Sequence, residues 1–228
     1  MKKLLQSFSI LLLALLIQAC DKNEVKVPDL GYRYFPTRIG SYVIYECDSI
    51  KIDDFKPSFD TIRFEMLEEI ESEFTDLENR RAVRVERSIR FDENDPWIFK
   101  EIITFTRTAE RAELWENNHR YVKMNFPVFS NPKWDANLFN IMEEAPVKIT
   151  EKDISLTLNG NSFDSTMTVV LEVPATLTKD RTFIEKYAKG TGLVYKAESD
   201  VVLEFRPDTV IEKLGYKFTK TIKEYGIR

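Results

Sequence analysis

The chain has 228 residues, of which 33 are Lys or Arg and 38 are Asp or Glu, giving a formal charge of −5. The two signs are interleaved along the chain, which excludes the clustered positive charge that a nucleic-acid-binding surface needs. The single His excludes a multi-His metal site within one chain. No metal or other cofactor is expected.

The N-terminus has the layout of a secretory signal. Lys2 and Lys3 precede an apolar run from Leu4 to Leu16, and the run ends at Leu16-Ile17-Gln18-Ala19-Cys20. The run is shorter than the roughly 20 apolar residues of a transmembrane helix, so a cleaved signal is favoured. The closing residues resemble the lipobox of bacterial lipoproteins, in which the cysteine is acylated. We therefore expect a signal peptide at 1–19 and lipid attachment at Cys20, with ordinary secretion or an uncleaved anchor as alternatives.

Residues 20–30 are polar, contain Pro28 and have no periodicity, which is typical of a linker. Two or three acyl chains on Cys20 would hold the protein stably at a membrane, whereas one would not. By analogy, an acidic residue such as Asp21 accompanies surface export in Bacteroidota and inner-membrane retention in enterobacteria. We expect a bacterial envelope location, with the outer membrane favoured.

From Tyr32 onward the apolar residues alternate with a period of two, which predicts half-buried strands in a single domain at 31–228. Asn117-Asn118 and Asn159-Gly160 predict hairpin turns. Residues 65–74 could form a helix, but strand is favoured because residues 61–64 lead into them. The segment 127–140 breaks the alternation and predicts an ordered loop or one helical turn that closes over the sheet.

One short helix is expected near the C-terminal third. Thr182-Phe183-Ile184-Glu185 has the form of a capping box, and Gly190 stands where a helix would end. The predicted fold is thus mainly β, a curved antiparallel meander of about nine to eleven strands, half-barrel or barrel-like, with one short docked helix. A sandwich is the alternative.

Few residues suggest catalysis. A hydrolase could use Glu68 or Glu143, assisted by His119, if two carboxyl groups met in one cleft. The segment 92–95 carries oxygen ligands suited to calcium but lacks the rest of a calcium loop, so a solvated turn is favoured. Gly190-Thr191-Gly192 closes the expected helix rather than opening one, which argues against a phosphate-binding loop. Cys47, left alone once Cys20 carries lipid, is expected to be a buried thiol.

Aromatic residues are the remaining candidates for ligand binding. Most of the 16 Phe and 9 Tyr are expected in the core. Trp134, in the irregular segment, and then Trp97 and Trp115 are the residues expected to face an apolar ligand or a sugar.

Three segments together, residues 34–42, 133–137 and 190–195, resemble an uncharacterised family of envelope lipoproteins of Bacteroidota. The resemblance implies a β-rich domain and lipidation at Cys20, and it implies no catalytic residue. The expected function is a non-enzymatic, membrane-anchored module that binds an apolar small molecule, a glycan or a partner protein. A structural subunit of an envelope assembly is the alternative, with the hydrolase as a third possibility.

Overall fold

A computed structural model of the protein describes residues 28–54, 60–128, 133–172, 176 and 178–228. The expected signal peptide, Cys20 and most of the expected linker lie outside these residues. The described residues form one antiparallel sheet of twelve strands. These are β1 (Ser41–Asp53), β2 (Asp60–Thr75), β3 (Arg81–Arg90), β4 (Ile98–Arg107), β5 (Arg111–Glu116), β6 (His119–Asn125), β7 (Lys133–Asp135), β8 (Pro146–Leu158), β9 (Asn161–Leu171), β10 (Lys179–Ala188), β11 (Gly192–Arg206) and β12 (Thr209–Ile227).

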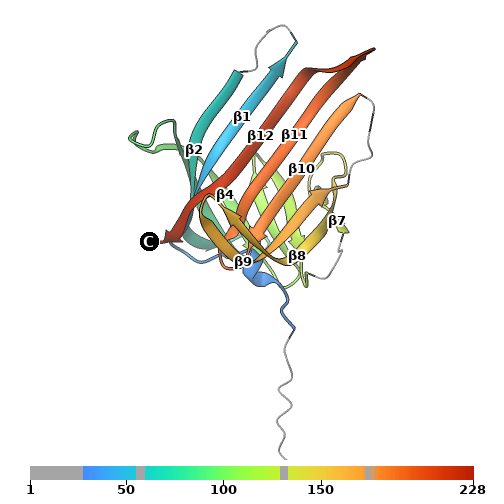
Figure 1. The fold of residues 1–228 in the computed structure, drawn as a ribbon. Coiled ribbons are helices and arrows are strands. Elements are labelled where there is room, and N and C mark those ends of the chain that lie inside the picture. Colours follow the sequence, from blue (N-terminus) through green and yellow to red (C-terminus); the bar gives the residue numbers. More distant parts are fainter. Residues whose placement is uncertain (1–27, 55–59, 129–132, 173–175, 177) are drawn as a thin grey trace, which may run out of the picture.

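The sheet is a meander that curls into a nearly closed barrel (Figure 1). Consecutive strands pair with each other except β6 and β7, and β12 returns to pair, through its residues 214–227, with the whole of β1. The two edge strands, β6 and β7, meet at a seam, where the Val122 amide donates to the Ala136 carbonyl at 2.9 Å. The Trp134 indole donates to the Val122 carbonyl, also at 2.9 Å. The expected curved antiparallel meander is confirmed, with twelve strands rather than nine to eleven.

The turns follow the expected local chemistry. Asn117 and Asn118 both have positive φ and connect β5 to β6, and Asn159 and Gly160 do the same between β8 and β9. These left-handed conformations match the twist of a tight hairpin, and Asn and Gly adopt them at low cost. Residues 65–74 lie in β2, so the strand interpretation of that segment is confirmed.

The expected helix at 182–190 is wrong, because residues 179–188 form strand β10. Thr182 lies opposite Ser199 of β11, and Tyr187 lies opposite Met167 of β9. A sequence with weak helical features becomes a strand when backbone hydrogen bonds are available on both sides, since tertiary pairing overrides local propensity. Gly190 therefore belongs to the β10–β11 turn, with φ +87°, and not to a helix C-terminus. The helical residues of the described chain are a single 3₁₀ turn, η2 (Tyr32–Tyr34).

The η2 turn closes one end of the barrel. Tyr34 is fully buried, and its hydroxyl hydrogen-bonds with Asp153 and Ser165 at 3.0 Å each. Arg107 donates to the carbonyls of Tyr32 and Phe35 at 3.1 and 2.9 Å. The first described residues enter at this closed end (Figure 1).

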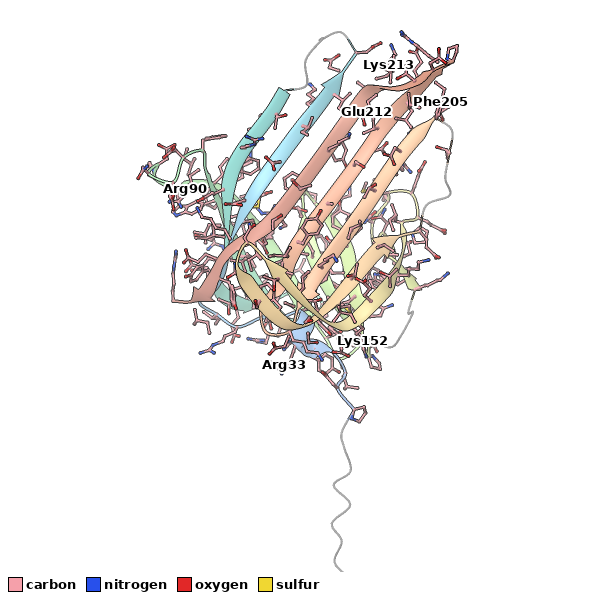
Figure 2. All side chains as sticks on the ribbon, in the orientation of Figure 1. Arg33, Arg90, Lys152, Phe205, Glu212 and Lys213 are labelled. Atoms are coloured by element: carbon pink, nitrogen blue, oxygen red, sulfur yellow. The ribbon has the colours of Figure 1, made fainter. Side chains whose placement is uncertain are left out.

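The opposite end is open and asymmetric. Strands β1, β2, β10, β11 and β12 run past the shorter strands as an overhanging sheet, with Phe205, Glu212 and Lys213 near its tip and Arg33 at the far end of the molecule (Figure 2). On the overhang, Tyr216 and Leu214 of β12 lie opposite Lys51 and Asp53 of β1. Tyr216 and Leu214 are two and four residues from Phe218, so all three side chains project from the same face of the sheet. Tyr216 and Leu214 are 42% and 57% exposed, and they share this face with their cross-strand partners Lys51 and Asp53, so the face is open and mixes apolar with charged side chains.

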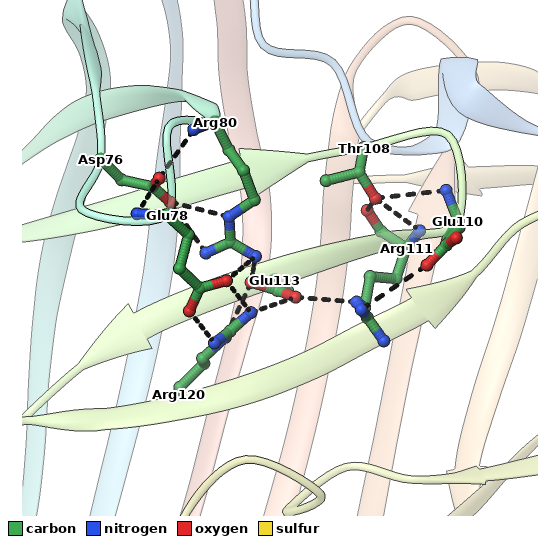
Figure 3. A network of polar contacts seen from close by, with 8 residues as sticks. All are labelled: Asp76, Glu78, Arg80, Thr108, Glu110, Arg111, Glu113 and Arg120. Carbon is green, nitrogen blue, oxygen red and sulfur yellow. Dashed lines mark hydrogen bonds and ion pairs between the residues drawn. The ribbon is translucent and has the colours of Figure 1, made fainter.

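A buried carboxylate holds the outer side of β5 and β6 together (Figure 3). The Glu113 side chain is fully buried, and the guanidinium groups of Arg80, Arg111 and Arg120 lie within 2.8 to 3.0 Å of its oxygens. The Phe139 ring covers Arg111 and Arg120, with guanidinium carbons 4.7 and 4.3 Å from its centroid. Because Phe139 belongs to the segment that follows β7, this cluster fastens the seam from outside.

Replacing Glu113 by Gln should lower the free energy of unfolding by about 3 kcal/mol, because three partly buried guanidinium groups would lose the buried carboxylate that they share. Chemical denaturation of the variant and the parent measures the difference. The matched control is Glu110→Gln, which removes an exposed carboxylate 3.6 Å from Arg111 and should cost less than about 1 kcal/mol. Equal losses in the two variants would contradict this account of the seam.

Candidate functional site

The barrel encloses a cavity of about 540 Å³. A barrel of eight strands is just filled by its own side chains, so one of twelve leaves space inside. The cavity volume lies within the roughly 300–1,000 Å³ range of small-molecule sites. Its wall comes from both halves of the meander and from the segment after β7, which contributes Asn137 and Met142.

The half of the cavity next to η2 is apolar. Phe35 covers the end, and the strands supply inward-facing apolar side chains, among them Ile70, Val85, Ile103, Phe105, Leu114, Tyr187 and Leu193. Phe35 and Phe105 pack edge to face with centroids 5.1 Å apart. A hydrocarbon group placed here would leave water and contact apolar side chains, which is favourable.

One inward position further along the strands, the lining becomes charged. Each charged residue is two positions along its strand from an apolar residue that also lines the cavity. The pairs are Glu68 and Ile70, Arg87 and Val85, Glu116 and Leu114, and Glu185 and Tyr187. We call the resulting layer the ionic belt, made of Glu68, Arg87, Glu101, Glu116, Lys123, Glu185, Lys196, Glu198 and Lys220.

Strand register places most of these charges in two rows. Glu101, Arg87 and Glu68 lie directly opposite one another on β4, β3 and β2. Lys220, Lys196 and Glu185 do so on β12, β11 and β10. The Lys220 ammonium bridges the two rows by contacting Glu68 at 2.9 Å across β1.

Arg87 is the most connected residue of the belt. Its guanidinium contacts Glu68 and Glu101 at 2.7 Å each and also Glu116. Burial alone would raise the pKa of Glu68, but the charges of Lys220 and Arg87 outweigh burial and hold that pKa at about 2. Glu68 is therefore ionised at neutral pH and locked in an ion-pair network.

The side of the belt on β10 and β11 combines charge with aromatic rings. Lys123 contacts Glu185 at 2.6 Å, and Lys196 contacts Glu198 at 2.5 Å. Both ammonium groups lie over the Phe183 ring, 5.3 and 5.5 Å from its centroid. Cations above an aromatic face are favourable, particularly where water is scarce.

The structure places the expected ligand-facing tryptophans elsewhere. Trp134 is buried at the seam, Trp97 lies under the Arg90 guanidinium at 4.4 Å, and Trp115 on β5 is 41% exposed. None of the three is among the described residues that line the cavity. The aromatic residues of the wall are instead Phe35, Tyr45, Phe105, Tyr121, Phe183, Tyr187 and Phe218.

The other candidate residues from the sequence also lie in different parts of the molecule. Of the expected acids Glu68 lines the cavity, whereas Glu143 is exposed in the segment after β7. His119 begins β6, where its ring nitrogen lies 2.7 Å from the Asn117 carbonyl. Cys47 is buried as expected, and burial raises its pKa to about 12, so the thiol stays protonated.

The described residues hold neither a cluster of metal ligands nor a membrane-spanning helix. No group of three or more His, Cys, Asp or Glu side chains there is arranged to hold a metal ion, the acidic segment 92–95 included. Across the same residues, no helix has the length and apolar character needed to cross a membrane.

The sequence does contain a signal for the ionic belt. Arg87 stands in phase with Val83, Val85 and Ile89, and Glu185 stands in phase with Phe183 and Tyr187. In a strand of period two, a charge in phase with apolar residues points to the same side as they do. Such a charge indicates either a polar interior or a network of buried ion pairs.

Comparison with known proteins adds little. No protein-family model matches the chain, and no curated protein sequence matches it either. A crystal structure from Parabacteroides distasonis ATCC 8503, of a protein provisionally described as a lipoprotein, is similar at 11% sequence identity. The alignment covers 85% of this chain and 98% of that one, with a TM-score of 0.42.

Glu68 makes a testable contribution to acid stability. Its pKa is depressed in the folded protein, so its stabilising effect is present above the ordinary glutamate pKa of 4.5 and is lost as the pH falls through about 2. The difference in unfolding free energy between the parent and Glu68→Gln should be about 3 kcal/mol near neutral pH and should shrink between pH 4.5 and 2.

Denaturation at several pH values measures this difference. Glu143→Gln, at an exposed acid outside the cavity, gives the background. A difference that stays constant from neutral pH to pH 2 would show that Glu68 does not carry its charge in the folded protein.

Proposed function

We propose that this protein is a lipid-anchored envelope protein that binds an apolar or amphipathic small molecule inside its barrel without catalysing a reaction. The observation that carries the proposal is the cavity of about 540 Å³, apolar at its closed end and charged above it. Binding sites for small molecules commonly combine an apolar pocket with a few polar groups that orient the ligand.

The anchor rests on the N-terminal sequence. Cys20 follows a basic start and an apolar run, and its surroundings resemble a lipobox. The described chain begins beside the closed end, where the Lys189 ammonium contacts Asp29 at 2.9 Å. An anchor joined to this end would leave the cavity entrance free. We place the protein in the bacterial envelope, with the outer membrane favoured.

The electrostatics of the cavity support binding over hydrolysis. Glu68 and Glu116 both contact Arg87, so two carboxylates do meet in one cavity. Burial would raise the pKa of Glu116, but Arg87 lowers it, as Lys220 and Arg87 lower that of Glu68. Carboxylates with depressed pKa values cannot serve as the general acid that glycoside hydrolysis requires.

Filling part of the closed half should weaken the binding of an uncharged apolar probe. N-phenyl-1-naphthylamine should bind the processed Cys20→Ser chain with a blue-shifted emission, because its rings would leave water for an apolar site. Leu193→Trp adds bulk to the wall and should weaken this binding at least about tenfold. Fluorescence titration measures both.

The matched control is Ile154→Trp, which adds the same bulk at a side chain that is 51% exposed and does not line the cavity. It should bind the probe like the parent. If the parent fails to bind, or if both tryptophan variants bind equally well, the cavity is not a ligand site.

The anchor is tested separately. Cys20→Ser removes the only sulfur available for acylation in the lipobox, so the processed protein should move from the membrane fraction to the soluble fraction. Cell fractionation and intact-mass measurement check this. A parent protein without lipid mass, or a variant that still sediments with membranes, would contradict lipid anchoring.

A further inference from the structure

The charges that line the cavity are balanced in sign. Four are carboxylates, from Glu68, Glu116, Glu185 and Glu198, and four are cations, from Arg87, Lys123, Lys196 and Lys220. Each of these cations contacts at least one of these carboxylates. A fifth carboxylate, from Glu101, lies behind Arg87. The cavity therefore offers both signs within a short distance and carries little net charge.

Stability alone does not explain this arrangement. Moving charges out of water is costly, and buried ion pairs are often no more stabilising than apolar side chains of similar size. The strands already place apolar residues at the neighbouring inward positions, so an apolar layer would continue the same pattern. A charged layer at this depth is more easily understood as a site for a polar part of a ligand.

Lys196–Glu198 is the ion pair of the belt in which both partners are accessible, since the partner of the similarly exposed Glu101 and Glu116 is the buried Arg87. The Lys196 and Glu198 side chains are 20% and 27% exposed, whereas Glu68, Arg87 and Lys220 are each 8% or less. The Phe183 and Phe218 rings lie 5.5 and 6.0 Å from the Lys196 ammonium. The Tyr216 hydroxyl donates to Glu198 at 2.5 Å, which connects the pair to the inward face of the overhang.

We propose that the cavity binds an amphiphile with a zwitterionic head group, its anionic group at Lys196, its cationic group at Glu198 and its hydrocarbon chain in the closed half. The proposal rests on the proposed function and specifies its ligand class. A zwitterion can insert between the two side chains and give each of them a new partner. A head group with one charge would satisfy one side chain and leave the other unpaired, which costs affinity.

Head-group preference can be measured with amphiphiles that share a dodecyl chain. Dodecylphosphocholine, dodecanoate, dodecyltrimethylammonium and dodecylglycerol are zwitterionic, anionic, cationic and neutral. Each is titrated below its micelle concentration against the Cys20→Ser chain loaded with N-phenyl-1-naphthylamine. Dodecylphosphocholine should displace the probe with an affinity at least about tenfold higher than any of the other three.

Single substitutions should shift the preference in opposite directions. Glu198→Gln frees Lys196 and should improve binding of dodecanoate relative to dodecylphosphocholine by about tenfold. Lys196→Gln frees Glu198 and should do the same for dodecyltrimethylammonium. The control variants Glu172→Gln and Lys133→Gln break an ion pair of 2.9 Å outside the cavity lining, and they should leave the order of affinities unchanged.

The outcomes separate the two proposals. Probe affinity, set by the closed half, should be equal in the parent and in all four charge variants, which also shows that they fold. If Glu198→Gln loses the probe, Glu116→Gln replaces it, because removing that carboxylate also leaves the cavity with an excess of positive charge and should favour dodecanoate. Equal affinities for the four amphiphiles, or preferences that ignore both substitutions, would overturn the zwitterion proposal and leave the cavity as a ligand site. Failure of the probe itself to bind would overturn the proposed function.

Discussion

The pairing of β12 with β1 is the constraint on which the rest of the structure depends. Every other neighbouring pair joins consecutive strands, and a meander of that kind could remain an open, twisted sheet. The β1–β12 ladder joins its two halves and brings the remaining edges, β6 and β7, face to face. The same ladder sets Lys220 beside Cys47, within reach of Glu68 on the far side of β1. Closure and the ionic belt thus have a common origin.

The strands were largely predictable because they follow from short-range chemistry. Alternation of apolar and polar residues marked most of them, and Asn117-Asn118 and Asn159-Gly160 marked two hairpins. The error at 182–190 has a physical cause. Thr182 and Glu185 satisfy a local helix pattern, whereas the hydrogen bonds that decide the outcome come from β9 and β11, which lie elsewhere in the sequence.

The site was much less predictable than the strands. Glu68 was a candidate as a possible catalytic acid, but its partners Arg87 and Lys220 are 19 and 152 residues away. The contact between these residues depends on strand register, which a local sequence pattern does not determine. The tryptophans did not mark the cavity lining, because a large ring with one polar atom is equally suited to covering the contact between two strand edges. Trp134 does so by covering the contact between β6 and β7 while its indole donates to a carbonyl.

The plug formed by η2 gives the barrel a polarity. Tyr34 and its neighbours seal the end where the described chain begins, and the overhang projects from the other end (Figure 1). A molecule tethered through its N-terminus would hold its sealed base toward the bilayer and its opening toward the surrounding fluid. Under the proposed anchor and the proposed ligand site, a ligand would then exchange through the surrounding water, with carriers or receptors that approach from outside, and would not enter directly from the bilayer.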